Sequence, residues 1–526
     1  MSGRGYGPVG AQLTRRSVLA GALSLPLLAA CAPLGNQGAA RPAAGPADPS
    51  AVFRYANTIG VSRFDPHRAS SSTDNTLLFL TYDRLVHTDT EGRAVPGLAT
   101  AWRTSGDGRV LELDLREGVR FHDGTPFDAA AVKANIERAK TVQASAVRAE
   151  LASIASVEVI GPLQVRLGLS APNAALPLIL SDRAGAMVSP AAFDNPDLDQ
   201  APVGAGMYRV TAYRPGASVT YRPTEGYWDP GAVRVAGIDM LIYTDAVTRL
   251  NALRTGEIDA TVLSPDQVAE AQAAGIAVTA GRTNNFYYLQ PNRARPFFSD
   301  VRVRRALWHA VDRQSLVDGL ARGYGKIAAQ PVPDWSFAHS PDVGPDPYPY
   351  DPELARRLLA EAGYPNGFSF EVFASAGSDQ GKHAEALQDF YAAVGIDMRI
   401  RIMDSAQIAD VFFVREEGDG LPSVGGGRAD PAQTTALRYT ADGFNNPGGS
   451  APPEFEQLQA DVVAVSDEAA RAAAFHRMMN AMVEQALEVI LYFPTPPIAT
   501  GPAVLDYHPF LADRPEFRGV AKAATS

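Results

Sequence analysis

Stretches patterned as strands alternate with stretches patterned as helices along most of this chain, and no other feature limits the possible folds as strongly. Residues 110–115 alternate apolar and acidic side chains, as a half-buried strand does. Asp128 precedes the apolar residues of a predicted helix, where an N-cap is expected. Further strands are predicted at 52–56, 157–160, 164–169, 208–213, 218–221, 237–243, 286–290, 368–373 and 398–402. Further helices are predicted at 74–85, 300–311 and 351–362, together with one that starts near residue 245 and one that ends at residue 394. This alternation predicts α/β domains.

The composition fits a globular chain with large buried cores. The chain has 526 residues, which leaves room for two or more domains. Because 46% of the residues are hydrophobic and only 20% are charged, a wholly disordered chain is excluded. The 47 Lys and Arg residues against 58 Asp and Glu give a net charge of −11, and an acidic surface disfavours nucleic acid as a partner.

The N-terminal segment has the pattern of an export signal. Arg15 and Arg16 precede a weakly apolar run that is too short to span a bilayer and that ends at Cys31. A paired arginine of this kind resembles a twin-arginine signal, and the residues before the cysteine resemble a lipoprotein processing box. We therefore expect residues 1–30 to be a signal peptide and Cys31 to be lipidated. The alternative is a plain secretory peptide with a chance cysteine.

Cys31 is the only cysteine of the chain, and a tether follows it. Structural disulfides, cysteine-based metal sites and a catalytic thiol elsewhere are therefore excluded. Residues 31–50 are rich in Pro, Gly and Ala without hydrophobic periodicity, which predicts a flexible tether. The proline-rich stretch 323–350 also lacks periodicity, and its length indicates a functional or domain-bridging loop.

A set of motifs runs in order along residues 52–500. The longest is Leu-Arg-Glu-Gly-Val-Arg-Phe-His-Asp-Gly-Thr-Pro-Phe at 115–127. Others are Tyr-Asp-Arg-Leu-Val at 82–86, Pro-Gly-Leu-Ala at 96–99, Pro-Val-Gly-Ala-Gly-Met-Tyr at 202–208, Leu-Arg-Thr-Gly-Glu-Ile-Asp at 253–259, Asp-Val-Arg-Val-Arg-Arg-Ala-Leu at 300–307 and Ala-Asp-Pro at 429–431. Together they resemble the family 5 extracellular solute-binding proteins of the dipeptide, oligopeptide and nickel type.

This resemblance implies an α/β fold of two lobes, the periplasmic-binding-protein clamp of the type II, large cluster C kind, with an inserted extra domain. Lobe one would take residues 51–82, 204–290 and 491–526, the inserted domain 83–203, and lobe two 291–490. Such a clamp closes by hinge motion, and closure must be tied to a difference in ligand affinity between the open and closed forms.

The resemblance also implies that the loop 424–431 faces the ligand, and here this loop departs from the family pattern. Gly427 lies where peptide-binding relatives often carry an acidic residue, and Gly425 and Ala429 lie where nickel-type relatives carry aromatic residues. Arg428 instead offers a planar donor fork for a carboxylate or phosphate, unless it pairs internally with Asp430 or another acid. Asp430 is a second candidate contact, or simply a turn or helix-start residue.

The remaining candidate contacts are polar or aromatic residues in loops and at strand ends. Asn285 and Tyr287 face one side of a predicted strand, although a strand aromatic is more often part of the core. Trp335 could stack on a ligand or cover an apolar seam. The other candidates are Arg63, His67, Tyr439 and Asn445, together with Asn446, which also fits a turn.

These observations predict a lipid-anchored, monomeric periplasmic binding subunit of an ABC importer that passes a small solute or short peptide to a membrane permease and its ATPase. A peptide-like or other amino-acid-derived compound is preferred because of Arg428. No cofactor, metal or catalysis is expected, because the eight histidines lack metal-ligand spacing and no nucleophile-elbow or P-loop motif is present. The alternatives are a tethered polypeptide-binding chaperone or sensor, and a periplasmic hydrolase.

Overall fold

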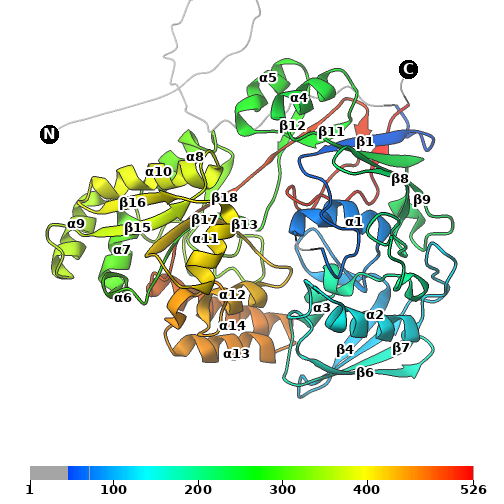
Figure 1. The fold of residues 1–526 in the computed structure, drawn as a ribbon, viewed down its shortest axis with the longest axis horizontal. Coiled ribbons are helices and arrows are strands. Elements are labelled where there is room, and N and C mark those ends of the chain that lie inside the picture. Colours follow the sequence, from blue (N-terminus) through cyan, green and yellow to red (C-terminus); the bar gives the residue numbers. More distant parts are fainter. Residues whose placement is uncertain (1–44, 70, 525–526) are drawn as a thin grey trace, which may run out of the picture. The chain divides into compact units, whose positions relative to one another are not determined.

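The computed structural model describes residues 45–69 and 71–524, and Figure 1 shows its helices and strands. The expected signal peptide with Arg15 and Arg16, the expected lipidation site Cys31 and most of the expected tether lie outside the described residues. Within the described part, no helix combines the length and the apolar character that crossing a bilayer requires.

A seven-stranded mixed sheet combines strands from three distant parts of the chain. Its order is β12-β19-β11-β1-β10-β9-β8, and β1 lies parallel to both of its neighbours. The strands are β1 Val52–Asn57, β8 Tyr208–Arg214, β9 Ser218–Pro223, β10 Gly237–Ile242, β11 Ala260–Val262, β12 Ala277–Ala280 and β19 Pro497–Thr500. The associated helices are α1 Asn75–Thr81, α4 Ala246–Arg254 and α5 Val268–Ala273. The parallel pairing of β1 with β10 and β11 fits the α/β domains that the alternating pattern predicts.

A four-stranded antiparallel sheet lies within residues 83–203 and has the order β4-β5-β7-β6. Its strands are β4 Ala99–Thr104, β5 Val110–Leu115, β6 Ile154–Gly161 and β7 Gln164–Leu169, and the hairpin β2 Val86–Thr88 and β3 Ala94–Pro96 precedes it. Helix α2 (Ala129–Thr141) packs on β6 and β7, and α3 spans Leu176–Ile179. The Asp128 carboxylate accepts a hydrogen bond from the Ala131 backbone N–H, which confirms the predicted N-cap.

A six-stranded sheet forms the centre of the remaining part, in the order β14-β18-β13-β17-β15-β16. Its strands are β13 Asn285–Pro291, β14 Gly325–Ile327, β15 Ser369–Ala374, β16 Asp397–Ile402, β17 Gly420–Gly426 and β18 Val489–Pro494. The helices around it are α6 Pro296–Ser299, α7 Val301–His309, α8 Arg313–Gly319, α9 Pro352–Glu361, α10 Asp379–Ala392 and α11 Ser405–Ala409. Helices α12 Pro431–Tyr439, α13 Glu454–Ala464 and α14 Glu468–Glu484 are grouped beside the sheet in Figure 1.

Short elements complete the described chain. Strands β20 Val504–Leu505 and β21 Ala521–Lys522 pair with each other near the C-terminus. The 3-10 turns span Ser72–Asp74, Arg183–Gly185, Pro190–Ala192, Pro230–Ala232, Pro265–Gln267 and Pro447–Gly449, and a π-helical turn spans Asp410–Val414.

The chain passes between the seven-stranded and six-stranded sheets through two short segments. Residues 281–284 join β12 to β13, and residues 495–496 join β18 to β19. The Gly281 backbone N–H donates to the Pro496 carbonyl oxygen at 2.8 Å, so the two segments lie side by side. The expected boundaries at residues 290 and 491 therefore fall inside two strands of one sheet. An apolar strand pattern does not say which sheet the strand joins, which explains the displacement of both boundaries.

Candidate ligand-binding cleft

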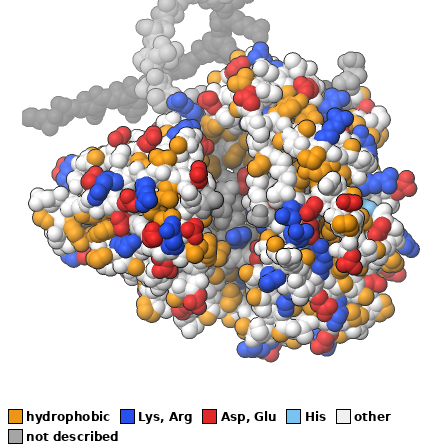
Figure 2. Space-filling model, viewed as in Figure 1, with side chains coloured by type: hydrophobic (Ala, Val, Ile, Leu, Met, Phe, Trp, Pro, Cys, Tyr) orange, Lys and Arg blue, Asp and Glu red, His pale blue; other side chains and the backbone are white. Residues whose placement is uncertain are grey.

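Figure 2 shows the molecular surface hollowed between the elements of the six-stranded sheet and those of the seven-stranded sheet. Two cavities of about 830 and 1030 Å³, including space open to solvent, share the residues Asp182, Arg428 and Arg514 and so form one continuous cleft. A third cavity of about 920 Å³ continues from Arg428 along α12.

One end of the cleft is apolar and aromatic. Trp335 meets Phe510 edge-to-face, with ring centroids 5.1 Å apart, and Phe79 and Phe337 line the same cavity. Gly92 lies against the Trp335 ring with a positive φ of 74°, and a Cβ atom there would come within 3.0 Å of the ring. Glycine is therefore required at this position by both backbone conformation and space. The proline-rich stretch 323–350 thus contributes one wall of the cleft.

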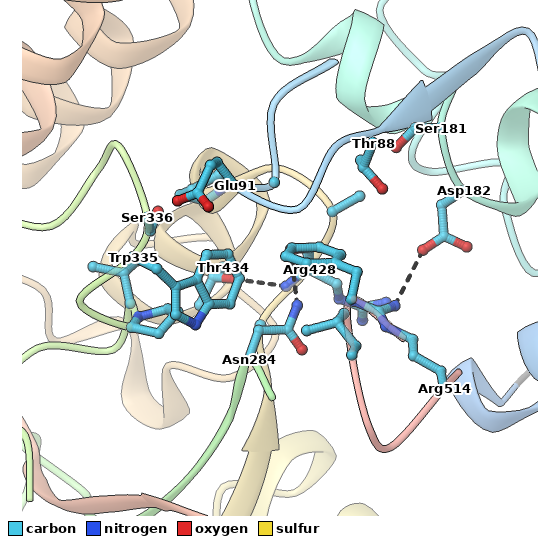
Figure 3. A pocket seen from close by; sticks show the side chains of 18 of the residues that line it. Thr88, Glu91, Ser181, Asp182, Asn284, Trp335, Ser336, Arg428, Thr434 and Arg514 are labelled. Atoms are coloured by element: carbon cyan, nitrogen blue, oxygen red, sulfur yellow. Dashed lines mark hydrogen bonds and ion pairs between the residues drawn. The ribbon is translucent and has the colours of Figure 1, made fainter. Parts of the chain in front are cut away.

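The other end of the cleft is charged and centres on Arg428, which is labelled in Figure 3. The Arg428 backbone N–H donates to Thr434 Oγ1 at 3.0 Å, and its carbonyl oxygen accepts from Asn284 Nδ2 at 3.5 Å. Its side chain is 47% exposed, and Nη1 lies 3.9 Å from Glu150 Oε1. Both backbone groups are thus held while the guanidinium extends into the cleft.

The glycine before Arg428 has a packing reason. The Gly427 N–H donates to the Asn284 carbonyl oxygen at 2.8 Å, and a Cβ atom at residue 427 would lie only 2.8 Å from that oxygen. A side chain at this position would push the loop off β13. Glycine here holds the Arg428 loop against the strand.

Two acidic side chains face Arg428 from the inserted part of the chain. Burial raises the pKa of Glu150 to about 7, the negative charge of Asp182 adds to this, and Arg428 opposes it. Burial also opposes ionisation of Asp182, but Arg514 and Arg183 outweigh it and lower its pKa. Asp182 accepts hydrogen bonds from Asn75 Nδ2 at 2.9 Å and Arg514 Nη1 at 3.3 Å. Asp182 is therefore a fixed negative charge, whereas Glu150 titrates near neutral pH.

Of the predicted site residues, Arg428, Trp335 and Asn445 line the cleft. The backbone carbonyl of Asn445 also accepts a hydrogen bond from Gln290. The fold brings these three residues together from the loop before α12, the proline-rich stretch and the segment after α12.

Three other predicted residues are buried with partners of their own. Asp430 caps α12 and forms a two-bond ion pair with Arg471. His67 accepts from Arg138 Nη1 and bonds the Ala186 carbonyl oxygen. Tyr439 packs against Phe455 in the core. These contacts give the three side chains structural roles, so we do not carry them into the proposed ligand contacts.

The remaining candidates are also held by protein groups. Asn285 Nδ2 donates to Asp513 Oδ2 at 2.7 Å. Tyr287 stacks on His383 with ring centroids 4.0 Å apart. Arg63 pairs with Asp199 at 3.3 Å, and Asn446 accepts from Arg293 at 2.6 Å. Their roles as ligand contacts stay predictions.

Among the cleft residues that sequence reasoning missed are four polar ones near Arg428: Asn75, Glu150, Asp182 and Arg514. They come from α1, the segment after α2, the turn after α3 and the C-terminal segment. None belongs to a motif, and only the folded chain brings them to Arg428. A buried polar atom marks the site as well, because Asn75 Oδ1 has no hydrogen-bond partner within the described residues. In the same part of the chain, no group of three or more His, Cys, Asp or Glu residues could hold a metal ion.

The model for bacterial extracellular solute-binding proteins, family 5 middle, matches residues 93–447, about two thirds of the chain. The chain belongs to this family. Members bind solutes for ABC importers, and the two-lobed α/β fold confirms the fold class that the sequence predicted. The residues of the Arg428 loop lie inside the matched range.

Among characterised relatives, this solute-binding protein is 34% identical over 351 residues to the glutathione-binding protein GsiB of Escherichia coli strain K12, covering 66% of this chain and 68% of the relative. The structure of AgaA of A. tumefaciens R10 in complex with agropinic acid matches with a TM-score of 0.76 and 25% identity, covering 90% of this chain and 99% of AgaA. The periplasmic binding protein DppA of Helicobacter pylori with a bound peptide matches with a TM-score of 0.76 and 23% identity, covering 90% and 98%. These relatives are binding proteins rather than enzymes.

Proposed function

We propose that this protein captures a peptide-like solute with at least one carboxylate and delivers it, by closure of its two lobes, to the permease of an ABC importer. Arg428 carries this proposal. Its guanidinium extends into the cleft, and among the described residues it makes no side-chain hydrogen bond. Arginine presents a planar fork of donors that matches a carboxylate.

The two ends of the cleft support a ligand that is polar at one end and partly apolar at the other. Trp335 and Phe510 can cover apolar atoms, while Arg428 and Arg514 supply positive charge. Glutathione, the ligand in the name of the GsiB relatives, carries two carboxylates and one amine on a short peptide-like chain. It is therefore the first compound to test.

Closure would proceed about the segments 281–284 and 495–496, which cross between the sheets side by side. We place lobe one, the inserted domain and lobe two as in the sequence prediction, with the two crossings moved to these segments. Because the cleft is lined from both sides, a bound solute contacts both lobes and favours the closed form.

The location of the protein is part of the proposal. The paired Arg15 and Arg16 would direct export, and lipid on Cys31 would hold the chain at the cell envelope. Mass spectrometry of the mature protein tests this directly. A lipid-modified N-terminal Cys31 is expected, and a Cys31→Ala variant should leave the membrane fraction.

The test of function is isothermal titration of the purified chain with glutathione, dipeptides, opines and nickel chelates, followed by thermal unfolding. A ligand at one hundred times its Kd adds about 2.7 kcal/mol of stability. We expect saturable binding of a peptide-like compound, recovered unchanged. Conversion of the compound would favour a hydrolase, and binding of unfolded polypeptide alone would favour a chaperone.

A further inference from the structure

Glu150 is a side chain of the cleft for which none of the structural roles described above accounts. The segment after α2 is fixed by its buried neighbours Val147 and Leu151, and the Glu150 backbone N–H donates to the Val147 carbonyl oxygen at 3.1 Å. The Ala146 N–H donates to the His67 carbonyl oxygen at 2.8 Å, which ties the segment to the loop after β1. The Glu150 side chain is therefore presented to the cleft by a well-anchored backbone.

The Glu150 carboxyl has unused hydrogen-bonding capacity. Among the described residues it accepts no side-chain hydrogen bond, and its nearest cation, Arg428 Nη1, is 3.9 Å from Oε1, beyond hydrogen-bond distance. Its side chain is 19% exposed. A carboxyl that is largely buried and has no hydrogen bond is costly unless a ligand supplies one.

Arg428 and Glu150 face each other across the cleft from different parts of the fold. Arg428 precedes α12, beside the six-stranded sheet, whereas Glu150 belongs to the inserted part of the chain. One is a cation with free donors and the other an acid with free acceptors. An α-amino acid head group has the complementary pair, a carboxylate and an ammonium on the same carbon.

We propose that Arg428 and Glu150 together bind an α-amino acid head group of the solute, its carboxylate on Arg428 and its ammonium on Glu150. This inference rests on the proposed function and deepens it, because it makes Glu150 a specificity-determining residue. A solute with only a carboxylate would leave Glu150 unpaired and would bind more weakly. The head group would also bridge the two sides of the cleft, which ties recognition to closure.

The charge of Glu150 gives the proposal a second readout. The groups that face it are Asp182, Arg183 and Arg428; burial and Asp182 keep its pKa near 7, while the two arginines lower it. An ammonium ligand requires the ionised carboxylate. Binding below pH 7 therefore releases a proton, and affinity for the ammonium-bearing solute rises with pH from 6 to 8.

The experiment compares glutathione with its des-amino analogue, glutaryl-Cys-Gly, by isothermal titration of the full chain at pH 6, 7 and 8. The carboxylates of glutathione titrate well below this range, and its amine titrates above it because a free carboxylate is attached to the same carbon. The thiol, whose pKa is about 8.5, is common to both ligands and cancels in the comparison. For the wild type we expect at least about 10-fold tighter binding of glutathione, with an affinity that rises with pH. Glu150→Gln should bring the two ligands within 3-fold of each other and remove the pH dependence, because glutamine carries no charge.

Two variants control for folding and for general charge. Glu150→Asp keeps the charge and should retain part of the preference for glutathione. Glu158→Gln removes an exposed acid of β6 that pairs with Arg166 and should leave the preference unchanged. If Glu150→Gln folds and still discriminates as the wild type does, the inference is overturned while the proposed function stands. If the wild type binds neither compound, glutathione as the solute and the head-group inference drawn from it both fall.

Discussion

Two charged residues of the Arg428 loop, Arg428 and Asp430, each face an opposite charge from a distant part of the chain. The two pairs differ in how completely their hydrogen-bonding groups are satisfied within the protein. Asp430 and Arg471 form two hydrogen bonds of 2.7 Å, and their side chains are 0% and 6% exposed. Arg428 and Glu150 lie 3.9 Å apart, with side chains 47% and 19% exposed. The first pair is complete without a ligand, whereas the second is not.

The difference shows where a charged residue stabilises the fold and where it is available for binding. Removing one member of a buried pair leaves an uncompensated charge, which costs about 3–5 kcal/mol. A pair whose arginine is half exposed and whose members share no hydrogen bond contributes at most about 1 kcal/mol, so the arginine can exchange its partner for a ligand with little loss of stability. Burial and hydrogen bonding, rather than residue type, thus separate Asp430 from Arg428.

The largest expected effect is on folding. Asp430→Asn keeps the helix cap but removes the charge opposite Arg471, and it should lower the free energy of unfolding by about 3–5 kcal/mol. Chemical denaturation measures this. The matched control is Asp467→Asn, which changes the exposed cap of α14 and should cost under about 0.5 kcal/mol. Equal losses in the two variants would contradict the structural role of the Asp430 pair.

The next effect concerns pH and the buried His67. Arg138 donates to His67 Nδ1 at 3.0 Å, so a proton on that atom would face the guanidinium. Burial above all lowers the pKa of His67 to about 4, with Arg138 also lowering it and Asp65 opposing. Between pH 4 and the ordinary histidine pKa of about 6.5, His67 is protonated in the unfolded chain but neutral in the folded chain. The free energy of unfolding therefore rises with pH across this window, by about 3 kcal/mol in total.

Chemical denaturation at pH 4.5, 5.5 and 7 checks the His67 prediction. His67→Gln should remove this part of the pH dependence because glutamine does not titrate. His508→Gln, at an exposed position, should leave the pH dependence as in the wild type. An unchanged slope in His67→Gln would place the acid sensitivity elsewhere.

A smaller effect, on binding rather than on folding, is expected from the Arg428–Glu150 pair. Arg428→Ala should weaken binding of the identified solute by about 10- to 100-fold, the range for a hydrogen-bonded charge. The free energy of unfolding should change by less than about 1 kcal/mol because the side chain is half exposed. Unchanged affinity would remove Arg428 as the carboxylate contact. Isothermal titration and denaturation of the same preparation separate the two effects.

The smallest effect is expected from an ordinary surface ion pair, and it shows whether the Arg428–Glu150 pair differs from such a pair. Arg63 and Asp199 are partly exposed and lie 3.3 Å apart. Arg63→Ala should change stability by less than about 0.5 kcal/mol and leave solute affinity unaltered. A marked loss of affinity would restore Arg63 as a ligand contact and extend the site beyond the Arg428 region.

By itself, the sequence determined the fold class and the family. Alternating strand and helix patterns and the motif at 115–127 depend on neighbouring residues, and local patterns survive in the folded chain, as the Asp128 cap of α2 illustrates. Two residues that line the cleft, Arg428 and Trp335, can also be predicted from the sequence. Arg428 lies in the loop that the family resemblance indicates, and Trp335 lies in the long proline-rich stretch without periodicity.

Only the tertiary structure decided which of the predicted polar residues face the cleft. Asp430 and Arg428 are two residues apart, and from the sequence both could bind a ligand. In the structure Arg471 of α14 forms hydrogen bonds with Asp430, whereas the Arg428 guanidinium has no hydrogen-bond partner among the described residues. Glu150 and Asp182 belong to no motif and reach Arg428 only through long-range packing. The physical reason is that burial and partner satisfaction depend on contacts between distant segments, which a local pattern does not encode.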